Sequence, residues 1–231
     1  MKVRAIKTRI FKEGENLDIF ISKYIPHLKE GSILVVTSKI VALSEKRTAI
    51  VKNAKEKERL IRSESDFAMR TKYVWLSIKE GMVMANAGID ESNADGKLIL
   101  FPRDSFKTAQ DIRKKIQKRH RMKKLGVLIT DSRAFPLRAG VVGVATGYAG
   151  FRGIKDYRGT PDIFGKRFQF SRVGIADGLA TAAVLEMGEG KEQRPLAVIE
   201  DAPVEFREKI SREELRIPLK DDLYLPLLKN I

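Results

Sequence analysis

The chain has 231 residues and no cysteine, which excludes a disulfide scaffold, a cysteine nucleophile and a zinc site built on thiolates, and fits a reducing cytoplasm. Hydrophobic residues make up 43% and charged residues 32%, a balance typical of globular proteins, and no apolar run approaches the ~20 residues of a membrane-spanning helix. The net charge of +15 fits an anionic partner and equally fits a solvated, lysine-rich surface. We therefore expect a cytoplasmic protein with no membrane segment.

The first half of the chain mixes strand and helix patterns. Alternation predicts a strand over 1–11, and apolar residues at helical spacing predict an amphipathic helix over 16–27. "EGSILVVTS" predicts a turn and a buried strand ending near Thr37, and residues 54–71 are charged and helix-prone. "YVWLSIKEGMVMANAG" predicts two strands joined by a turn at 79–81.

The second half begins with a basic segment, 103–124, in which Ile112 and Ile116 predict a helix docked on one apolar face. "LGVLITDS" predicts a buried strand that stops at an acid, and "AGVVGVATGYAGF" a strand closely approached by another backbone. "RGIKDYRGTPDIFGKRF" is typical of a polar loop, "VGIADGLATAAVLEMGEG" of a helix capped by glycine, and "PLAVIED" of a last strand. Because no regular βαβ rhythm appears, we expect an α+β fold of mixed sheets and packed helices. One domain would span 1–231, with the charged tail 201–231 least clearly part of it.

Three acids, Asp90, Asp131 and Glu189, each stand where an apolar element ends in a turn that carries Gly or Ser. Such carboxylates can converge on a rigid scaffold, and a convergent cluster of oxygen ligands favours Mg²⁺ or Mn²⁺, ions that serve nucleotide phosphates. For each acid alone, an Asx turn or a helix N-cap is the commoner role, and spacing does not show that the three meet. No GxxxxGK[ST] or GxGxxG motif is present, so a nucleotide site would be of another design.

The two histidines, His27 and His120, have no triad-like context, so a general base would have to be a carboxylate, and we assign no catalytic residue. The ten Lys and Arg of 103–124 suggest an alternative function, a non-catalytic basic protein that binds nucleic acid. Only Phe106 could stack on a base there, so a solvated helix face, or a platform that steers an acidic substrate, is favoured over nucleic acid.

Six blocks occur in an order that resembles the coenzyme F420:L-glutamate ligase family, also called gamma-glutamyl ligases: "VVTSKIVALSEKR", "NAGIDESN", "GVLITDS", "RAGVVGVATGYAG", "DYRGTPDIFGKRF" and "ADGLATAAVLEMGEG". The likeness covers about residues 3–200. It implies a ligase that joins L-glutamate to the carboxylate end of a deazaflavin cofactor through an acyl phosphate. It also implies GTP or ATP as co-substrate, two Mg²⁺ or Mn²⁺ ions, a candidate monovalent cation and an intertwined homodimer.

The resemblance also implies functional roles for individual residues. The implied metal ligands are Asp90, Asp131, Ser132 and Glu189. The implied nucleotide contacts are Arg9, Ile10, Phe11, Lys12, Ser38, Lys39, Asn93, Met187, Gly188, Gly190 and Lys191, with the "MGEGKEQR" loop closing over the nucleotide. For the glutamate or acceptor carboxylates we suggest Arg138, Lys155, Arg158 and Arg167, for which ordinary surface charge is an equal alternative.

Some positions depart from the family pattern. Leu43 stands where the family has a lysine that reaches the nucleotide, and Lys46 where it has glycine, so that Lys39 or Lys46 is left as a substitute. Gly178 stands where an acid is common. These departures leave open a changed acceptor, such as a folate, a peptide or a protein tail, and a degenerate ligase fold that only binds a ligand.

Overall fold

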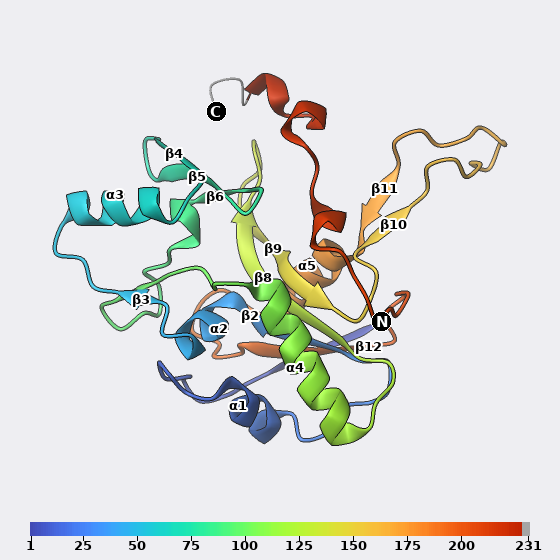
Figure 1. Ribbon diagram of the computed structural model, residues 1–231, viewed down its shortest axis with the longest axis horizontal. Coiled ribbons are helices and arrows are strands. Elements are labelled where there is room, and N and C mark those ends of the chain that lie inside the picture. Colours follow the sequence, from blue (N-terminus) through green and yellow to red (C-terminus); the bar gives the residue numbers. More distant parts are fainter. Residues whose placement is uncertain (228–231) are drawn as a thin grey trace.

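A five-stranded sheet forms the centre of the computed structural model, which describes residues 1–227 (Figure 1). Residues 228–231 of the predicted domain lie outside the described residues. The strand order is β1 (Lys2–Ile6), β12 (Leu196–Glu200), β2 (Ile33–Thr37), β8 (Gly126–Ala134) and β9 (Val141–Ala149). Only the β2–β8 pair is parallel, so the sheet is mixed, as the expected α+β class requires.

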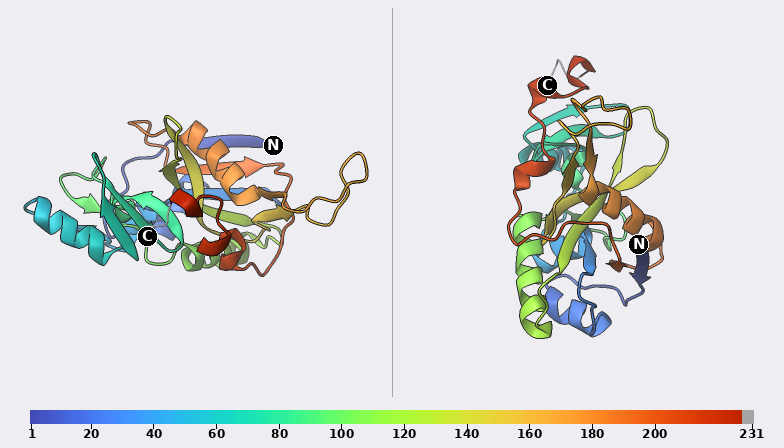
Figure 2. Two further views of the ribbon diagram at one scale, coloured as in Figure 1. Left: turned by 90° about the horizontal axis from the view of Figure 1, so that it is seen from above. Right: turned by 90° about the vertical axis from the view of Figure 1, so that its right-hand side faces the viewer.

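Both faces of this sheet are covered by helices because its central strands are apolar on both sides. Leu34 and Val36 of β2 face a core that includes residues of α1 (Leu17–Tyr24), α2 (Ser38–Ser44) and α4 (Ser105–His120). Ile33 and Val35 point to the opposite face, which α5 (Ile175–Met187) covers. Figure 2 shows α4 and α5 on opposite sides of the sheet.

Two glycines of β9 allow neighbouring helices to approach its backbone, as predicted. A Cβ added at Gly143 would lie 2.4 Å from the carbonyl oxygen of Ala180 in α5. A Cβ added at Gly147 would lie 2.4 Å from the backbone of Ser105 at the start of α4. Any larger side chain would therefore push a helix away from the sheet.

Several predicted elements have other bounds. The first strand ends at Ile6, and the first helix covers only Leu17–Tyr24 because the side chain of Asn16 caps its start. The region 54–71 is not one helix: α3 (Ala54–Ser63) is followed by β4 (Phe67–Arg70). The predicted stop of β8 at an acid is wrong, because pairing with β9 continues through Ala134.

Smaller sheets flank the main one. The predicted hairpin is confirmed as β5 (Trp75–Lys79) and β6 (Met82–Ala85), joined at Glu80 and Gly81 with φ of 53° and 75°. It pairs with β4, and η1 (Asn86–Gly88) follows. A short pair joins β3 (Thr48–Ala49) to β7 (Leu98–Ile99).

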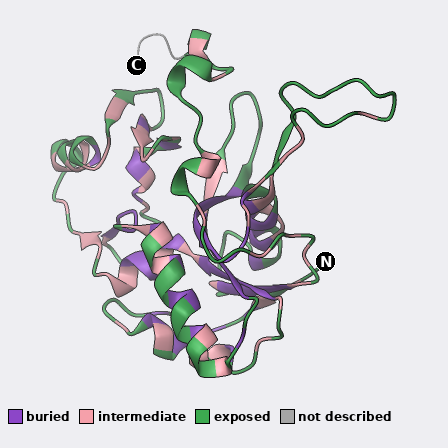
Figure 3. Ribbon diagram, turned by 45° about the vertical axis from the view of Figure 1, so that its right-hand side comes forward, coloured by how far each residue is buried: buried purple, intermediate pink, exposed green. Residues whose placement is uncertain are grey.

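The segment predicted as a polar loop, 152–168, instead contains the strand β10 (Ile154–Asp156), which pairs with β11 (Arg172–Gly174) just beyond it. Because its first two residues belong to β11, the helix predicted from Val173 begins only at Ile175. The β10–β11 hairpin projects from the body of the protein, and its tip is largely exposed (Figures 1 and 3). Exposure of this length of chain, with phenylalanines near its tip, suggests a surface that another molecule covers.

The C-terminal segment, 202–227, runs back over the body and includes η2 (Arg212–Leu215), η3 (Leu219–Asp221) and η4 (Leu225–Leu227). Glu208 accepts two hydrogen bonds from Arg113 of α4, at 2.9 and 2.7 Å. Glu214 accepts one from the hydroxyl of Tyr148 at 2.5 Å, and this contact and burial together raise the pKa of Tyr148. Over residues 1–227, no helix combines the length and apolar character needed to cross a membrane.

Candidate functional site

The segment 187–195 runs from the last residue of α5 to the residue before β12, and we call it the 187–195 loop. It starts at a sharp turn. Gly188 has a φ of 80° and its N–H donates to the carbonyl of Val184 at 2.8 Å, which ends the helix. A Cβ at Gly188 would lie 2.5 Å from the carboxyl carbon of Glu192, so a side chain there would displace the Glu192 side chain, and the positive φ favours glycine at this position. The turn exposes Glu189 and Gly190 immediately beyond the buried Met187.

This 187–195 loop lies against the ends of two strands. The N–H of Thr8, just after β1, donates to the carbonyl of Gln193 at 2.9 Å. The N–H of Thr37, at the end of β2, donates to the carbonyl of Pro195 at 3.0 Å. The predicted nucleotide segments 9–12 and 38–39 therefore both begin beside the loop.

Two further segments reach the same loop through side chains. The amide of Asn93 donates to the carbonyl of Gly190 at 3.5 Å. The hydroxyl of Ser132 in β8 donates to the carboxylate of Glu189. Residues predicted from five separate parts of the sequence thus gather around one loop, which is the region we identify as the candidate site.

Asp90 is held at the edge of this region by a lysine and by its own turn. Its backbone pairs with Ile99 through two hydrogen bonds of 2.9 Å, and its carboxylate accepts from the N–H of Ser92 at 2.6 Å. The ammonium of Lys39 lies 2.7 Å from Asp90 Oδ2 and also donates to the carbonyl of Ser92 at 2.9 Å. Burial alone would raise the pKa of Asp90, but the hydrogen bonds from Lys39 and Ser92 outweigh it, so this pKa is lowered.

Asp131 has a different cationic partner. Because side chains two apart on a strand point the same way, Arg133 follows Asp131 on the same face of β8. Its Nη1 lies 2.5 Å from Asp131 Oδ2. Ser132 points away from both, toward Glu189.

The three predicted acids reach the site but do not form one compact cluster. Within residues 1–227, no group of three or more His, Asp or Glu side chains is placed to hold a metal ion. Asp90 and Asp131 are instead neutralised by Lys39 and Arg133. The donors themselves, three carboxylates and one hydroxyl, are the oxygen ligands that Mg²⁺ and Mn²⁺ prefer, so their chemistry fits the predicted metals.

The predicted nucleotide residues divide into exposed and buried groups. Phe11, Ser38 and Met187 are buried, so only their backbones are available to a ligand. Ile10, Lys12, Gly188, Gly190 and Lys191 are exposed.

Arg9 is also exposed and pairs with Glu15 at 2.7 Å, beside a cavity of about 140 Å³. The lining residues of this cavity are Arg9, Glu15, Asn16, Ile19, Phe20 and Lys23. It offers space next to the predicted nucleotide segment 9–12.

The four suggested carboxylate-binding cations lie elsewhere. Arg138 is exposed between β8 and β9. Lys155, Arg158 and Arg167 belong to the β10–β11 hairpin, where Arg158 pairs with Asp156 at 2.6 Å and Arg167 donates to the carbonyl of Gly159. The contacts of the three hairpin cations are local, and they do not join the 187–195 loop in the described chain.

The departures from the family pattern have local explanations. Leu43 packs against the apolar core at the end of α2. Lys46 has a φ of 55°, the left-handed conformation that favours the glycine expected at this position, and its side chain lies against Gly14. Lys46 is therefore near the segment 9–12, whereas Gly178 has open space around it.

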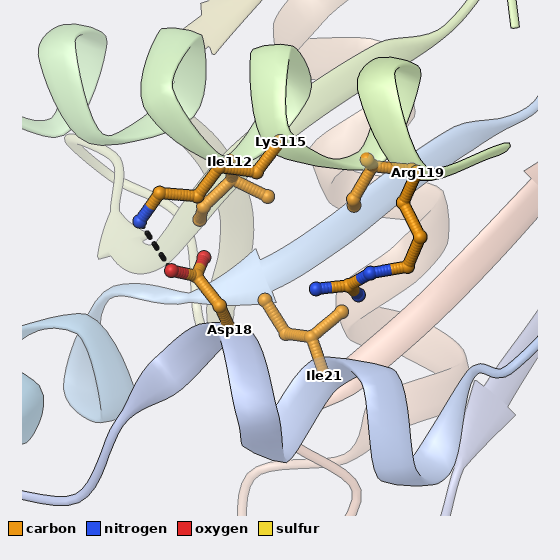
Figure 4. A pocket seen from close by; sticks show the side chains of 6 residues that line it. Asp18, Ile21, Ile112, Lys115 and Arg119 are labelled. Carbon is orange, nitrogen blue, oxygen red and sulfur yellow. Dashed lines mark hydrogen bonds and ion pairs between the residues drawn. The ribbon is translucent and has the colours of Figure 1, made fainter. Parts of the chain in front are cut away.

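The basic helix α4 is less free than its sequence suggests. Lys115 pairs with Asp18 of α1, and Arg119 donates to Ser22, across a shallow hollow between the two helices (Figure 4). Arg113 is buried and paired with Glu208. Part of the basic charge therefore serves packing within the chain.

Two site residues, Arg133 and Ser92, were not predicted. Each stands two residues after a predicted acid, Asp131 or Asp90. Strand periodicity would have placed Arg133 beside Asp131 once β8 was extended, and Ser92 follows the Asx-turn pattern of an acid and the backbone N–H two residues on.

Comparison with known proteins confirms the family resemblance. Residues 5–201 match the model of the F420-0:Gamma-glutamyl ligase family. The chain is 37% identical over 222 residues to the coenzyme F420:L-glutamate ligase of Methanococcus maripaludis strain C6, covering 88% of each chain. It is 30% identical over 244 residues to the enzyme of that name from Methanocaldococcus jannaschii, covering 97% of this chain and 96% of the relative. The chain therefore belongs to the F420-0:gamma-glutamyl ligase family.

Proposed function

We propose that this protein is a nucleotide- and metal-dependent amide ligase that adds L-glutamate to a carboxylate acceptor, with an F420-type cofactor as the first candidate acceptor. The observation that supports the proposal is that the 187–195 loop, which carries Glu189, is contacted by Asn93 and Ser132 and by the residues just before the predicted nucleotide segments 9–12 and 38–39. The two relatives described above, each aligned with this chain over most of its length, are named for the same ligation.

Asp90, Asp131, Ser132 and Glu189 are the residues we propose for holding two Mg²⁺ or Mn²⁺ ions, with a monovalent cation as a further candidate. Bound there, divalent cations would offset the negative charge of the nucleotide phosphates. Lys39 and Arg133 already neutralise Asp90 and Asp131. When a metal ion binds, each of these basic side chains therefore has to move away or share its carboxylate with the ion.

The remaining chemistry follows from the acceptor. A carboxylate is a poor acyl donor, so the terminal phosphoryl group of GTP or ATP is transferred to it, giving an acyl phosphate and releasing GDP or ADP. The neutral amine of L-glutamate then attacks the acyl carbon, the amide bond forms as the amine loses a proton, and inorganic phosphate leaves. This chain would contribute chiefly by positioning, which can lower such a barrier by ~7–11 kcal/mol, and by excluding water from the acyl phosphate.

The exposed segments suggest where each substrate enters. Segment 9–12 and the cavity at Arg9 offer space beside the nucleotide contacts, and Lys46 stands near them where the family lysine is absent. We propose a homodimer in which the exposed β10–β11 hairpin is covered by the second copy. A folate, a peptide or a protein tail remains an alternative acceptor.

The test is mass spectrometry after incubation of the full chain with L-glutamate, GTP or ATP, Mn²⁺ or Mg²⁺, and a panel of F420-type, folate and peptide acceptors. The expected result is an acceptor that gains one or more glutamyl residues, with release of phosphate. Reactions without nucleotide, and with Asp131→Asn, are the matched controls. If no acceptor gains mass and a labelled oligonucleotide binds in a strongly salt-dependent manner, the nucleic-acid alternative replaces this proposal.

A further inference from the structure

Arg133 is the cation most closely tied to a predicted metal ligand. Its Nη1 lies 2.5 Å from Asp131 Oδ2 and also donates to the carbonyl of Ser132 at 3.0 Å. The side chain is 11% exposed, so water screens this pair far less than it screens a surface ion pair.

The surroundings of Arg133 offer little else to balance its charge. The guanidinium lies over the ring of Phe101, 5.6 Å from its centroid, and Nη2 is 3.6 Å from the sulfur of Met84. Its Nε is buried and has no hydrogen-bond partner within residues 1–227. Asp131 is the carboxylate that pairs with Arg133 in the described chain.

A guanidinium that donates to Asp131 Oδ2 takes up a lone pair of the oxygen that a divalent cation would bind, so the two compete for this oxygen. We propose that Arg133 is an intramolecular competitor for Asp131 that weakens metal binding at this ligand, and so sets the metal concentration at which the site fills. This inference rests on the proposed function, because it takes Asp131 as a metal ligand. Arg133 is a positioning residue here, since it acts through Asp131.

A competing role and a supporting role of Arg133 predict opposite changes in metal affinity when this residue is removed. If Arg133 only held Asp131 in place for the metal, its removal would weaken metal binding. If it competes, its removal frees Oδ2 and strengthens metal binding. Lys39 stands in a similar relation to Asp90, but it also belongs to a predicted nucleotide segment, so Arg133 gives the cleaner test.

The experiment is a Mn²⁺ titration of the full chain without nucleotide, followed by the electron paramagnetic resonance signal of free Mn²⁺. Arg133→Gln is expected to bind Mn²⁺ at least about tenfold more tightly than the wild type, the scale of one charge-assisted hydrogen bond. Arg133→Lys, which keeps the charge, should stay near wild type. Arg70→Gln removes the same charge from an exposed position on β4 and should change nothing.

Arg133→Met preserves packing on Phe101 and Met84, so it replaces the glutamine variant if that one fails to fold. In the Asp131→Asn background, removal of Arg133 should bring no gain. Weaker or unchanged Mn²⁺ binding in the folded Arg133 variants overturns the inference while leaving the metal site and the proposed ligase standing. A wild type and variants that all fail to bind Mn²⁺, both alone and with a non-hydrolysable GTP analogue, overturn the inference together with the metal requirement of the proposed function.

Discussion

The ammonium of Lys39, at the start of α2, lies 2.7 Å from Asp90 Oδ2, although the whole of β3, α3 and the β4–β6 sheet separates the two residues in sequence. This pair fixes the turn that carries Asp90 and Asn93 against the end of β2. The same pair helps to lower the pKa of Asp90 and so favours the charged form of this carboxylate.

Lys39→Met should make stability less dependent on acid pH. A carboxylate whose pKa is lowered on folding adds stability above its ordinary pKa of 3.8, and this stability is lost as the pH falls toward the lower folded value. Asp90 is 43% exposed, so screening limits the effect to under about 1 kcal/mol. Melting temperatures of the wild type and Lys39→Met should therefore differ at pH 7 and converge as the pH falls well below 3.8. A gap that persists in acid would show that Lys39 acts through packing.

Asp131→Asn should abolish glutamate transfer, by more than about a hundredfold, because it removes a proposed metal ligand. It should also lower the free energy of unfolding by about 1–2 kcal/mol, because the Arg133 side chain, 11% exposed, loses the carboxylate that balances its charge. Product formation by mass spectrometry and a thermal melt measure the two effects. Asp111→Asn, on the exposed face of α4, is the matched control and should leave both unchanged. Near-normal turnover of Asp131→Asn would remove this residue from the site.

Lys46→Gly should leave the protein as stable as the wild type or more stable. Relief of the left-handed backbone, at about 1 kcal/mol, is offset by the greater freedom of glycine in the unfolded chain. Nucleotide affinity should fall if Lys46 replaces the family lysine. Lys46→Asn, which tolerates the same backbone and also loses the charge, should show the same weaker affinity in a nucleotide titration. Equal affinity in all three proteins would mean that Lys46 does not reach the nucleotide.

Replacing Phe164 and Phe170 together with serine should convert a dimer into a monomer, measured by light scattering. The two rings are 88% and 85% exposed on the β10–β11 hairpin, and apolar surface of this kind is typical of an interface. Leu185→Ser, at a comparably exposed position on α5, is the control and should remain dimeric. A wild type that is already monomeric would contradict the expected dimer.

Glu208→Gln should lower the free energy of unfolding by about 1–2 kcal/mol, because it removes the charge that balances a buried guanidinium. The side chain of Arg113 is only 7% exposed. Glu205→Gln, which affects exposed pairs with Arg152 and Arg207, should cost much less in the same denaturant titration. Equal losses of unfolding free energy in Glu208→Gln and Glu205→Gln would mean that burial of Arg113 does not strengthen its ion pair.

The apolar patterns predicted the elements of the fold well because burial on a sheet or helix leaves a clear periodicity. The bounds were less accurate where tertiary pairing decides them: β8 continues past Asp131 only because β9 pairs with it, and β4 exists only because β5 lies beside it. No local pattern reports such partners.

The candidate site likewise has residues that the sequence predicted and residues that depend on tertiary packing. Asp90 and Glu189 were singled out by their place at the ends of apolar elements, and Ser132 and Asn93 by resemblance to family motifs. The structure brings the segments of these residues to one loop. The pairing of Asp90 with Lys39 depends on how α2 packs, which the sequence does not state. Arg133 was missed because the strand was predicted to end before it.

The position of β12 constrains how the protein is made. This strand is formed by residues 196–200, yet it lies between β1 and β2, the first two strands of the chain. Neither early strand can complete its hydrogen bonds while the ribosome is still adding the middle of the polypeptide. The central sheet therefore closes only after residues 196–200 have been synthesised, and until then the apolar strands β1 and β2 lack the partner that lies between them.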